Sequence, residues 1–175
     1  CYVTRKGLNP VDGTVVIAEV DSYETERHEL VLKAHIVKEI GYKDAVGMDI
    51  LMILHQLKIP TVFPDSVIEE ANRVSETISP EELEGRVDLR QELTVTIDGA
   101  DAKDLDDAVA LVKREDGTFV LTVSIADVSY YVTENSEMDK EAFERGTSVY
   151  LTDRVVPMLP QRLSNGICSL HPYEE

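Results

Sequence analysis

Residues 96–111 of the chain read TIDGADAKDLDDAVAL. Five aspartates stand between Asp98 and Asp107, and one lysine is the only basic residue among them. The residues on either side are rich in β-formers, and Gly99 permits a sharp turn directly after Asp98. The stretch therefore predicts a strand that ends at Asp98, a tight acidic loop, and a second strand that starts near Asp106.

The predicted turn brings Asp104, Asp106 and Asp107 back towards Asp98. Because side chains two residues apart share one face of a strand, we expect Asp104 and Asp106 to point one way and Asp107 the other. Each pair of carboxylates a few ångströms apart costs about 4 kcal/mol at an effective dielectric constant of 20. Cations or hydrogen-bond donors must offset this repulsion. Oxygen ligands without histidine or cysteine favour hard ions, which means Mg²⁺ or alternatively Mn²⁺.

The composition of the chain weakens the metal interpretation. Of its 175 residues, 34 are acidic and 17 are basic, which gives a formal net charge of −17. Such a chain contains about two acids in any ten residues, so an ordinary solvated acidic loop stays an alternative. The negative charge also argues against binding of a nucleic-acid backbone by these residues. No apolar run is long enough to cross a bilayer, and no signal peptide is recognised.

The two cysteines, Cys1 and Cys168, are far apart in the sequence and form no CxxC pair. This usage predicts no disulfide and a reducing, cytoplasmic location. The chain begins with Cys1 rather than Met and ends in HPYEE. We therefore expect it to be a piece of a longer protein.

A calcium loop of the EF-hand type is excluded by spacing. Counted from Asp98, the third and sixth positions are Ala100 and Lys103, where Asp or Asn and Gly are required. Counted from Asp104, the fifth position is Ala108. A hard-metal cluster with few other catalytic groups is instead typical of phosphoryl transfer, in which two ions about 3.5–4 Å apart act on one phosphodiester.

No other catalytic motif competes with the aspartates. The sequence lacks a GxSxG elbow, a P-loop and a GxGxxG fingerprint. Ser164, Ser169 and His171 are close in sequence, but without a partnered acid they are interpreted as turn residues. The histidines at positions 28, 35 and 55 have no metal-ligand spacing, and His55 is expected to be packed or half-exposed.

The rest of the chain predicts strands, then helices, then strands again. Residues 1–41 contain two β-rich runs, and residues 42–85 contain two apolar-periodic helices and a capping box, SPEEL, that begins at Ser79. From residue 86, the runs DDAVALVKRE and TFVLTVSIADV are joined by Asp-Gly at 116–117, a strong hairpin signal. The segment SEMDKEAFERG predicts a helix that Ser136 caps and Gly146 ends.

Several long motifs resemble one family. GRVDLRQELTVTIDGADAKDLDDAVAL, VSIADVSYYV, RGTSVYL and VVPMLPQRLSNGICSL are similar, in this order, to the start of the catalytic domain of the ribonuclease II / ribonuclease R family of 3′-to-5′ exoribonucleases. The resemblance covers residues 86–173 and is greater to the ribonuclease R branch. Residues 12–75, including IPTVFPDSVIEEA, are more weakly similar to the end of that family's second cold-shock domain and the helices that follow.

The resemblance implies an α+β chain in three parts. Residues 1–41 would be the C-terminal part of a cold-shock, OB-like barrel, residues 42–85 a helical connector, and residues 86–175 the opening, truncated part of an RNB catalytic domain. The implied activity is processive, Mg²⁺-dependent hydrolysis of single-stranded RNA from its 3′ end to nucleoside 5′-monophosphates. The implied partner is single-stranded RNA, and no protein partner is indicated.

The resemblance also assigns the aspartates residue by residue. Asp98 and Asp107 correspond to direct ligands of the Mg²⁺. Asp106 corresponds to the acid most closely tied to hydrolysis, and Asp104 to one that helps to hold the metal site and the RNA 3′ end. All four are thus metal-site residues, with Asp104 and Asp106 also catalytic. Asp101 matches none of the four and is assigned to the loop surface.

Tyr150 corresponds to an aromatic residue that stacks on the last base of the RNA. Without the family, a half-buried strand tyrosine would be the preferred interpretation of Tyr150. The family's basic RNA-binding residues and its S1 domain have no counterpart in these 175 residues, so we expect the isolated chain to have little or no nuclease activity. A non-catalytic relative and a structural β-rich domain without a metal remain alternatives.

Overall fold

The structure, a computed structural model, describes residues 2–26, 29–100 and 102–172. It divides into two compact units, Cys1–Ile59 and Pro60–Glu175, each of which is described by itself. Cys1, His28 and Asp101 lie outside the described residues, so the expectations for a free Cys1 and a surface Asp101 are not tested.

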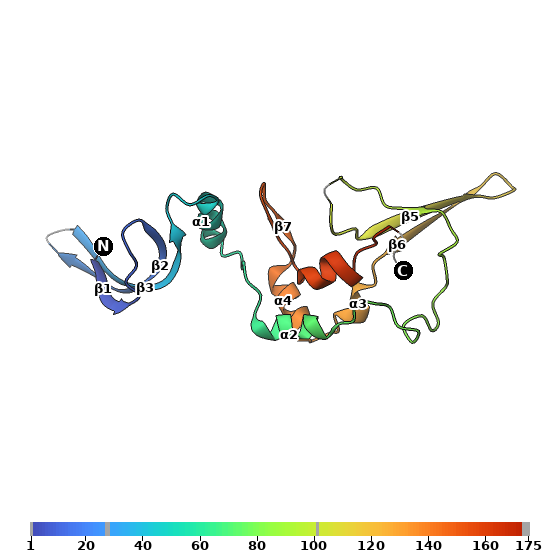
Figure 1. Ribbon diagram of the computed structural model, residues 1–175. Coiled ribbons are helices and arrows are strands. Elements are labelled where there is room, and N and C mark those ends of the chain that lie inside the picture. The colour runs from blue at the N-terminus through green and yellow to red at the C-terminus, as the bar shows by residue number, and fades with distance from the viewer. Residues whose placement is uncertain (1, 27–28, 101, 173–175) are drawn as a thin grey trace. The chain divides into compact units, whose positions relative to one another are not determined.

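The first unit is built on one three-stranded sheet. Its strands are β1 (Tyr2–Gly7), β2 (Thr14–Glu26) and β3 (Glu29–Tyr42), in the order β1-β3-β2. β2 and β3 form an antiparallel hairpin, and β1 runs parallel to β3 (Figure 1). The sequence therefore predicted the two long strands correctly.

Helix α1 (Met48–Gln56) packs against β3. Met48 and Leu54 of the helix are buried, as are Ala34 and Ile36 of the strand. A Cβ at Gly41 would lie 2.6 Å from the terminal methyl of Met48, so a larger residue there would require the Met48 side chain to shift. The helix begins directly after Gly47, which stands in the left-handed region with φ 77°.

The core of the second unit lies between helices. α2 (Asp65–Arg73) and α4 (Glu137–Arg145) pack side by side, with α3 (Val128–Tyr131) and a short π-helical turn, η1 (Leu163–Ile167), next to them (Figure 1). The buried cluster comprises Val67, Ala71, Met138, Leu163 and Cys168. No helix among the described residues is long and apolar enough to cross a bilayer.

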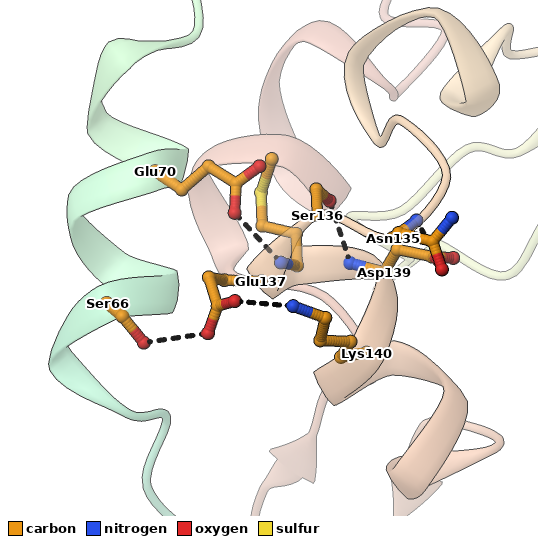
Figure 2. A network of polar contacts seen from close by, with 8 residues as sticks. Ser66, Glu70, Asn135, Ser136, Glu137, Asp139 and Lys140 are labelled. Atoms are coloured by element: carbon orange, nitrogen blue, oxygen red, sulfur yellow. Dashed lines mark hydrogen bonds and ion pairs between the residues drawn. The ribbon is translucent and has the colours of Figure 1, made fainter.

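The start of α4 is fixed by side chains of two helices (Figure 2). Ser136 caps the helix as predicted, accepting a hydrogen bond from the backbone N–H of Asp139 over 3.1 Å. Glu70 of α2 accepts the backbone N–H of Met138 over 3.0 Å. Two of the N–H groups that a helix start leaves unpaired are thereby satisfied. Gly146 ends the helix with φ 70°, also as predicted.

A second sheet carries the acidic stretch. Its strands are β4 (Thr94–Val95), β5 (Asp107–Lys113) and β6 (Phe119–Ile125), all antiparallel. β5 and β6 form the predicted long hairpin, in which Gly117 adopts φ 84° at the turn. Leu111, Leu121, Val123 and Ile125 on this hairpin are exposed apolar side chains. A separate two-stranded hairpin joins β7 (Val149–Tyr150) and β8 (Val155–Val156).

Two expectations for this unit are wrong in extent. The strand expected to end at Asp98 stops at Val95; a ladder continued from Thr94↔Ala110 and Val95↔Val109 to Asp98 would place that residue directly opposite Asp106. Like charges in directly opposed positions destabilise a sheet. The segment of the capping box is a series of turns rather than a helix, although Glu82 does accept the Ser79 N–H over 3.2 Å. Gly85, with φ 78°, ends it before a helix can propagate.

Candidate active site

The acidic loop enters β5 with its backbone held at several points. Asp107 is the first residue of β5 and pairs with Ile125 of β6. The carbonyl of Asp106 accepts a hydrogen bond from the N–H of Ala126 over 3.0 Å. Asp98 lies in the irregular segment after β4. The aspartates therefore come from two segments that meet at one end of the hairpin.

The carboxyl group of Asp106 is the electrostatic centre of this loop. Its pKa is raised above the ordinary value, first by burial and then by the charges of three neighbours, Asp104, Asp107 and Asp98. The other three predicted aspartates are thus close enough to influence Asp106. The raised pKa means that the uncompensated negative charge of the Asp106 carboxylate is disfavoured, so binding of a proton or another cation there is favoured.

The donor set fits a hard cation, but the geometry is not that of a closed site. Four carboxylates that repel one another are the ligands that Mg²⁺ or Mn²⁺ accepts. Within residues 2–26, 29–100 and 102–172, however, no three acidic, histidine or cysteine side chains are grouped so that they could hold a metal ion. The assignment of Asp98, Asp104, Asp106 and Asp107 as metal ligands remains a prediction.

Tyr150 lies next to the acidic loop. Its hydroxyl donates a hydrogen bond of 2.5 Å to Oδ2 of Asp104, and this bond, assisted by burial, raises the pKa of Tyr150 to about 12. The residue is 64% exposed, so its ring is not the half-buried strand residue considered from the sequence. The structure therefore brings the predicted RNA-binding tyrosine into contact with one of the predicted catalytic aspartates.

Ser169 bonds to the backbone of the acidic loop. Its hydroxyl accepts the N–H of Leu105 over 2.9 Å and donates to the carbonyl of Lys103 over 3.2 Å. The N–H of Leu170 donates to the carbonyl of Leu105 over 2.8 Å. The interpretation of Ser169 as a turn residue missed this role, because no sequence spacing links positions 64 residues apart. Among the interactions described, the side chains of Ser164 and His171 bond only to Asn165.

An ion pair lies beside the acidic loop and was not predicted. Arg86 donates to Asp127 over 2.7 Å, and its guanidinium lies 5.3 Å from the centre of the Tyr130 ring. The pKa of Asp127 is lowered by this bond and then by one from Ser129. Both Arg86 and Asp127 occur in motifs quoted above, GRVDLR and VSIADVSYYV, so the motifs were the available signal.

Cys168 belongs to the core below the loop. It is 3% exposed and forms no disulfide. Burial, followed by the charges of Asp106 and Asp127, raises the pKa of its thiol to about 11. The group therefore stays a neutral thiol near pH 7 and is not a nucleophile of the reactive type.

Arg145, the last residue of α4, fixes the hairpin that carries Tyr150. Its side chain is 3% exposed, and it donates to the carbonyls of Pro60, Val62 and Pro157 over 3.0–3.2 Å and to Glu141 over 2.9 Å. The guanidinium also lies 3.7 Å from the centre of the Phe63 ring. Arg145 thereby connects the first residues of the second unit to the end of the β7–β8 hairpin that follows β8.

The model of the RNB domain matches residues 86–175. The chain belongs to the RNB domain family. A cold shock domain model matches residues 1–64, so the predicted α+β arrangement of a cold-shock part followed by an RNB part is confirmed. Asp98, Asp104, Asp106, Asp107 and Tyr150 all lie within the RNB match.

Curated relatives of this RNB chain carry one name. This chain is 52% identical over 171 residues to ribonuclease R 1 of Lactococcus lactis, and the match covers 98% of this chain and 21% of that protein. It is 50% identical over 157 residues to ribonuclease R of Thermotoga maritima, a match that covers 89% of this chain and 22% of that protein. To ribonuclease R of Escherichia coli it is 45% identical over 160 residues, which covers 91% of this chain and 19% of that protein. The chain spans about a fifth of the length of these relatives.

Solved structures give the same picture for the RNB fold. Mycoplasma genitalium RNase R in complex with double-stranded RNA matches with a TM-score of 0.90 and 35% identity, over 99% of this chain and 31% of that one. Yeast Ssd1, a pseudonuclease, matches with a TM-score of 0.60 over 87% of this chain and 19% of that one. At 18% identity, this second likeness concerns the fold alone.

Proposed function

We propose that the chain is part of a 3′-to-5′ exoribonuclease that degrades single-stranded RNA to nucleoside 5′-monophosphates. The observation that carries the proposal is the acidic loop centred on Asp106, in an RNB domain whose relatives are ribonucleases R. Retention of all four aspartates favours this function over that of a non-catalytic relative. A cytoplasmic location is part of the proposal, and the free thiol of Cys168 is consistent with it.

Mg²⁺, with Mn²⁺ as an alternative, is the proposed cofactor. When bound, such an ion supplies Lewis acidity and lowers the pKa of water at the phosphodiester. Asp98 and Asp107 would hold it directly, and Asp104 and Asp106 would complete its surroundings. The raised pKa of Asp106, caused by burial and by its acidic neighbours, sets this carboxyl apart from an ordinary aspartate and supports its assignment to the hydrolytic step.

Tyr150 is the proposed contact to the terminal base. Its exposure leaves the ring accessible to a base, while the bond to Asp104 fixes the hydroxyl. Stacking of a base on an aromatic ring contributes about 1–3 kcal/mol and tolerates any sequence. A tyrosine at this place therefore suits an enzyme that shortens RNA without sequence preference.

The net charge of −17 indicates that this chain by itself binds RNA phosphates only weakly. We propose that basic residues elsewhere in the longer protein bind the RNA, and that residues 1–175 alone have little or no nuclease activity. The expected location of these groups follows from the family resemblance.

Labelled single-stranded RNA tests the activity. With Mg²⁺, the full-length protein is expected to release a 3′-terminal label first, as a mononucleotide, and to shorten 5′-labelled RNA progressively. The isolated chain is expected to release neither. Internal cuts, or RNA binding without hydrolysis by the full-length protein, would contradict the proposed function, and brisk mononucleotide release by the isolated chain would contradict the division of tasks.

A titration with Mn²⁺ tests the metal assignment. An ion that binds only the folded chain must raise its melting temperature, by mass action. Asp107→Asn is expected to abolish this increase. Asp116→Asn, in the distant hairpin turn, changes the charge equally and is expected to preserve it. An unchanged increase in Asp107→Asn would exclude Asp107 as a ligand.

A further inference from the structure

The hydroxyl of Ser169 bonds to both residues that flank Asp104. It accepts from the N–H of Leu105 and donates to the carbonyl of Lys103, at 2.9 and 3.2 Å. The Lys103 carbonyl belongs to the peptide unit before Asp104, and the Leu105 N–H belongs to the one after it. One side chain thus limits the rotation of the backbone at a residue whose carboxylate belongs to the candidate active site.

Neighbouring contacts extend this attachment over residues 103–106. The N–H of Leu170 donates to the carbonyl of Leu105, and the N–H of Ala126 donates to the carbonyl of Asp106. The backbone over residues 103–106 is therefore bonded to residues 169–170 on one side and to the end of the β5–β6 hairpin on the other. The Asp104 carboxylate itself accepts from Tyr150.

Ser169 is held independently of its hydroxyl. Its own N–H donates to the carbonyl of Gly166 over 2.8 Å, and its carbonyl accepts from His171 over 3.0 Å. The preceding residue, Cys168, is buried in the core cluster with Leu163. Removing the hydroxyl therefore leaves the segment around residue 169 in place and affects the loop that is attached to it.

We propose that Ser169 is a positioning residue, which places the Asp104 and Asp106 carboxylates for the reaction without touching RNA. This inference rests on the proposed function. Catalytic groups must be held to within a fraction of an ångström, and a loop attached at fewer points populates geometries in which the carboxylates are misplaced. Ser169 therefore contributes to turnover through Asp104 and Asp106 rather than to the binding of RNA.

Three variants in the full-length protein separate this role from a general effect on folding. Ser169→Ala removes both hydroxyl bonds, and Ser169→Thr restores a hydroxyl at the same place. Ser164→Ala is the matched control on the same segment, because the Ser164 hydroxyl bonds to the Asn165 side chain and is remote in its bonding from the acidic loop. Amide hydrogen exchange of peptides covering residues 103–107 and 109–113 is measured together with kcat and KM on single-stranded RNA.

Ser169→Ala is expected to speed exchange over residues 103–107 about tenfold and to leave residues 109–113 unchanged. It is expected to lower kcat by roughly tenfold or more with KM within about twofold of wild type. Ser169→Thr should return both values towards wild type, and Ser164→Ala should change neither.

Unchanged exchange over residues 103–107, faster exchange throughout the domain, or an unchanged kcat would each overturn the proposal. If the wild-type protein does not hydrolyse RNA, the proposed function fails, and the exchange data alone still decide whether Ser169 positions the loop.

Discussion

The hydroxyl of Tyr150 donates a 2.5 Å hydrogen bond to Oδ2 of Asp104, 46 residues earlier in the chain. From the sequence, these two residues had separate tasks, base stacking for Tyr150 and support of the metal site for Asp104. The bond links the two tasks, because a movement of the tyrosine changes the surroundings of the carboxylate.

The ionisation of Tyr150 should report this bond. The bond raises the pKa from the ordinary 10.0 to about 12, so its contribution to stability is complete below pH 10 and is lost as the pH rises towards 12. In metal-free buffer, Asp104→Asn should move the Tyr150 titration back towards pH 10, as measured by tyrosinate absorbance. Tyr150→Phe assigns the signal. Equal titration of Tyr150 in the wild type and in Asp104→Asn would disprove the link.

Arg145 and Arg73 end the helices α4 and α2 and should differ greatly in importance. Arg145→Ala removes a 3% exposed guanidinium and leaves Glu141 and the part-buried Pro157 carbonyl without their donor, while the exposed Pro60 and Val62 carbonyls can bond to water, which together should cost about 1.5–3 kcal/mol. Arg73→Ala removes a 3.8 Å pair with Glu69 between side chains that are 77% and 70% exposed, which should cost less than about 0.5 kcal/mol. Urea unfolding of both variants measures the difference, and similar losses would be inconsistent with the buried role of Arg145.

Glu70 and Glu69, adjacent on α2, provide a second matched pair. Glu70→Ala removes the acceptor of the Met138 N–H and a negative charge from the start of α4, with an expected loss of about 1 kcal/mol. Glu69→Ala removes only the exposed pair with Arg73 and should cost a few tenths of a kcal/mol. Thermal unfolding distinguishes them. A loss at position 69 as large as that at position 70 would show that α2 itself, not the cap of α4, was affected.

Asp106→Asn should make the protein more stable and less active. Burial and three neighbouring aspartates disfavour the charged carboxylate, so the neutral amide should raise the melting temperature in a chelating buffer by roughly 2 °C. RNA hydrolysis by the full-length protein should fall at the same time. Asp116→Asn is the control of opposite sign, because Asp116 accepts bonds from Thr118 that favour its charge. A melting temperature lowered in both variants would remove the argument from repulsion.

Local signals in the sequence predicted much of the second unit. Ser136, Gly146 and the Asp-Gly turn at residue 117 each act within a few residues, and each has the predicted role. The acidic loop was predicted because its charge density is local too. The end of β4 was not, since the length of a strand depends on what lies opposite it, and here an aspartate would have faced an aspartate.

The contacts that hold the site were not predictable from composition or periodicity. Ser169 and Arg145 bond to backbone groups, which have no residue type and leave no pattern in the sequence. The short η1 turn likewise depends on tertiary packing around Leu163. Long-range hydrogen bonds to the main chain can be assigned only when the fold is known.

The separation of 64 positions between Leu105 and Ser169 also affects the order in which the site can form during synthesis. A ribosome adds about 5–20 residues per second, so Ser169 is made roughly 3–13 s after Leu105. The β5–β6 hairpin, with its short connection, can close in microseconds once both strands have left the ribosome. The β5–β6 hairpin can therefore fold seconds before Ser169, which attaches the neighbouring loop, is synthesised. Until then, the nascent chain carries four poorly restrained carboxylates.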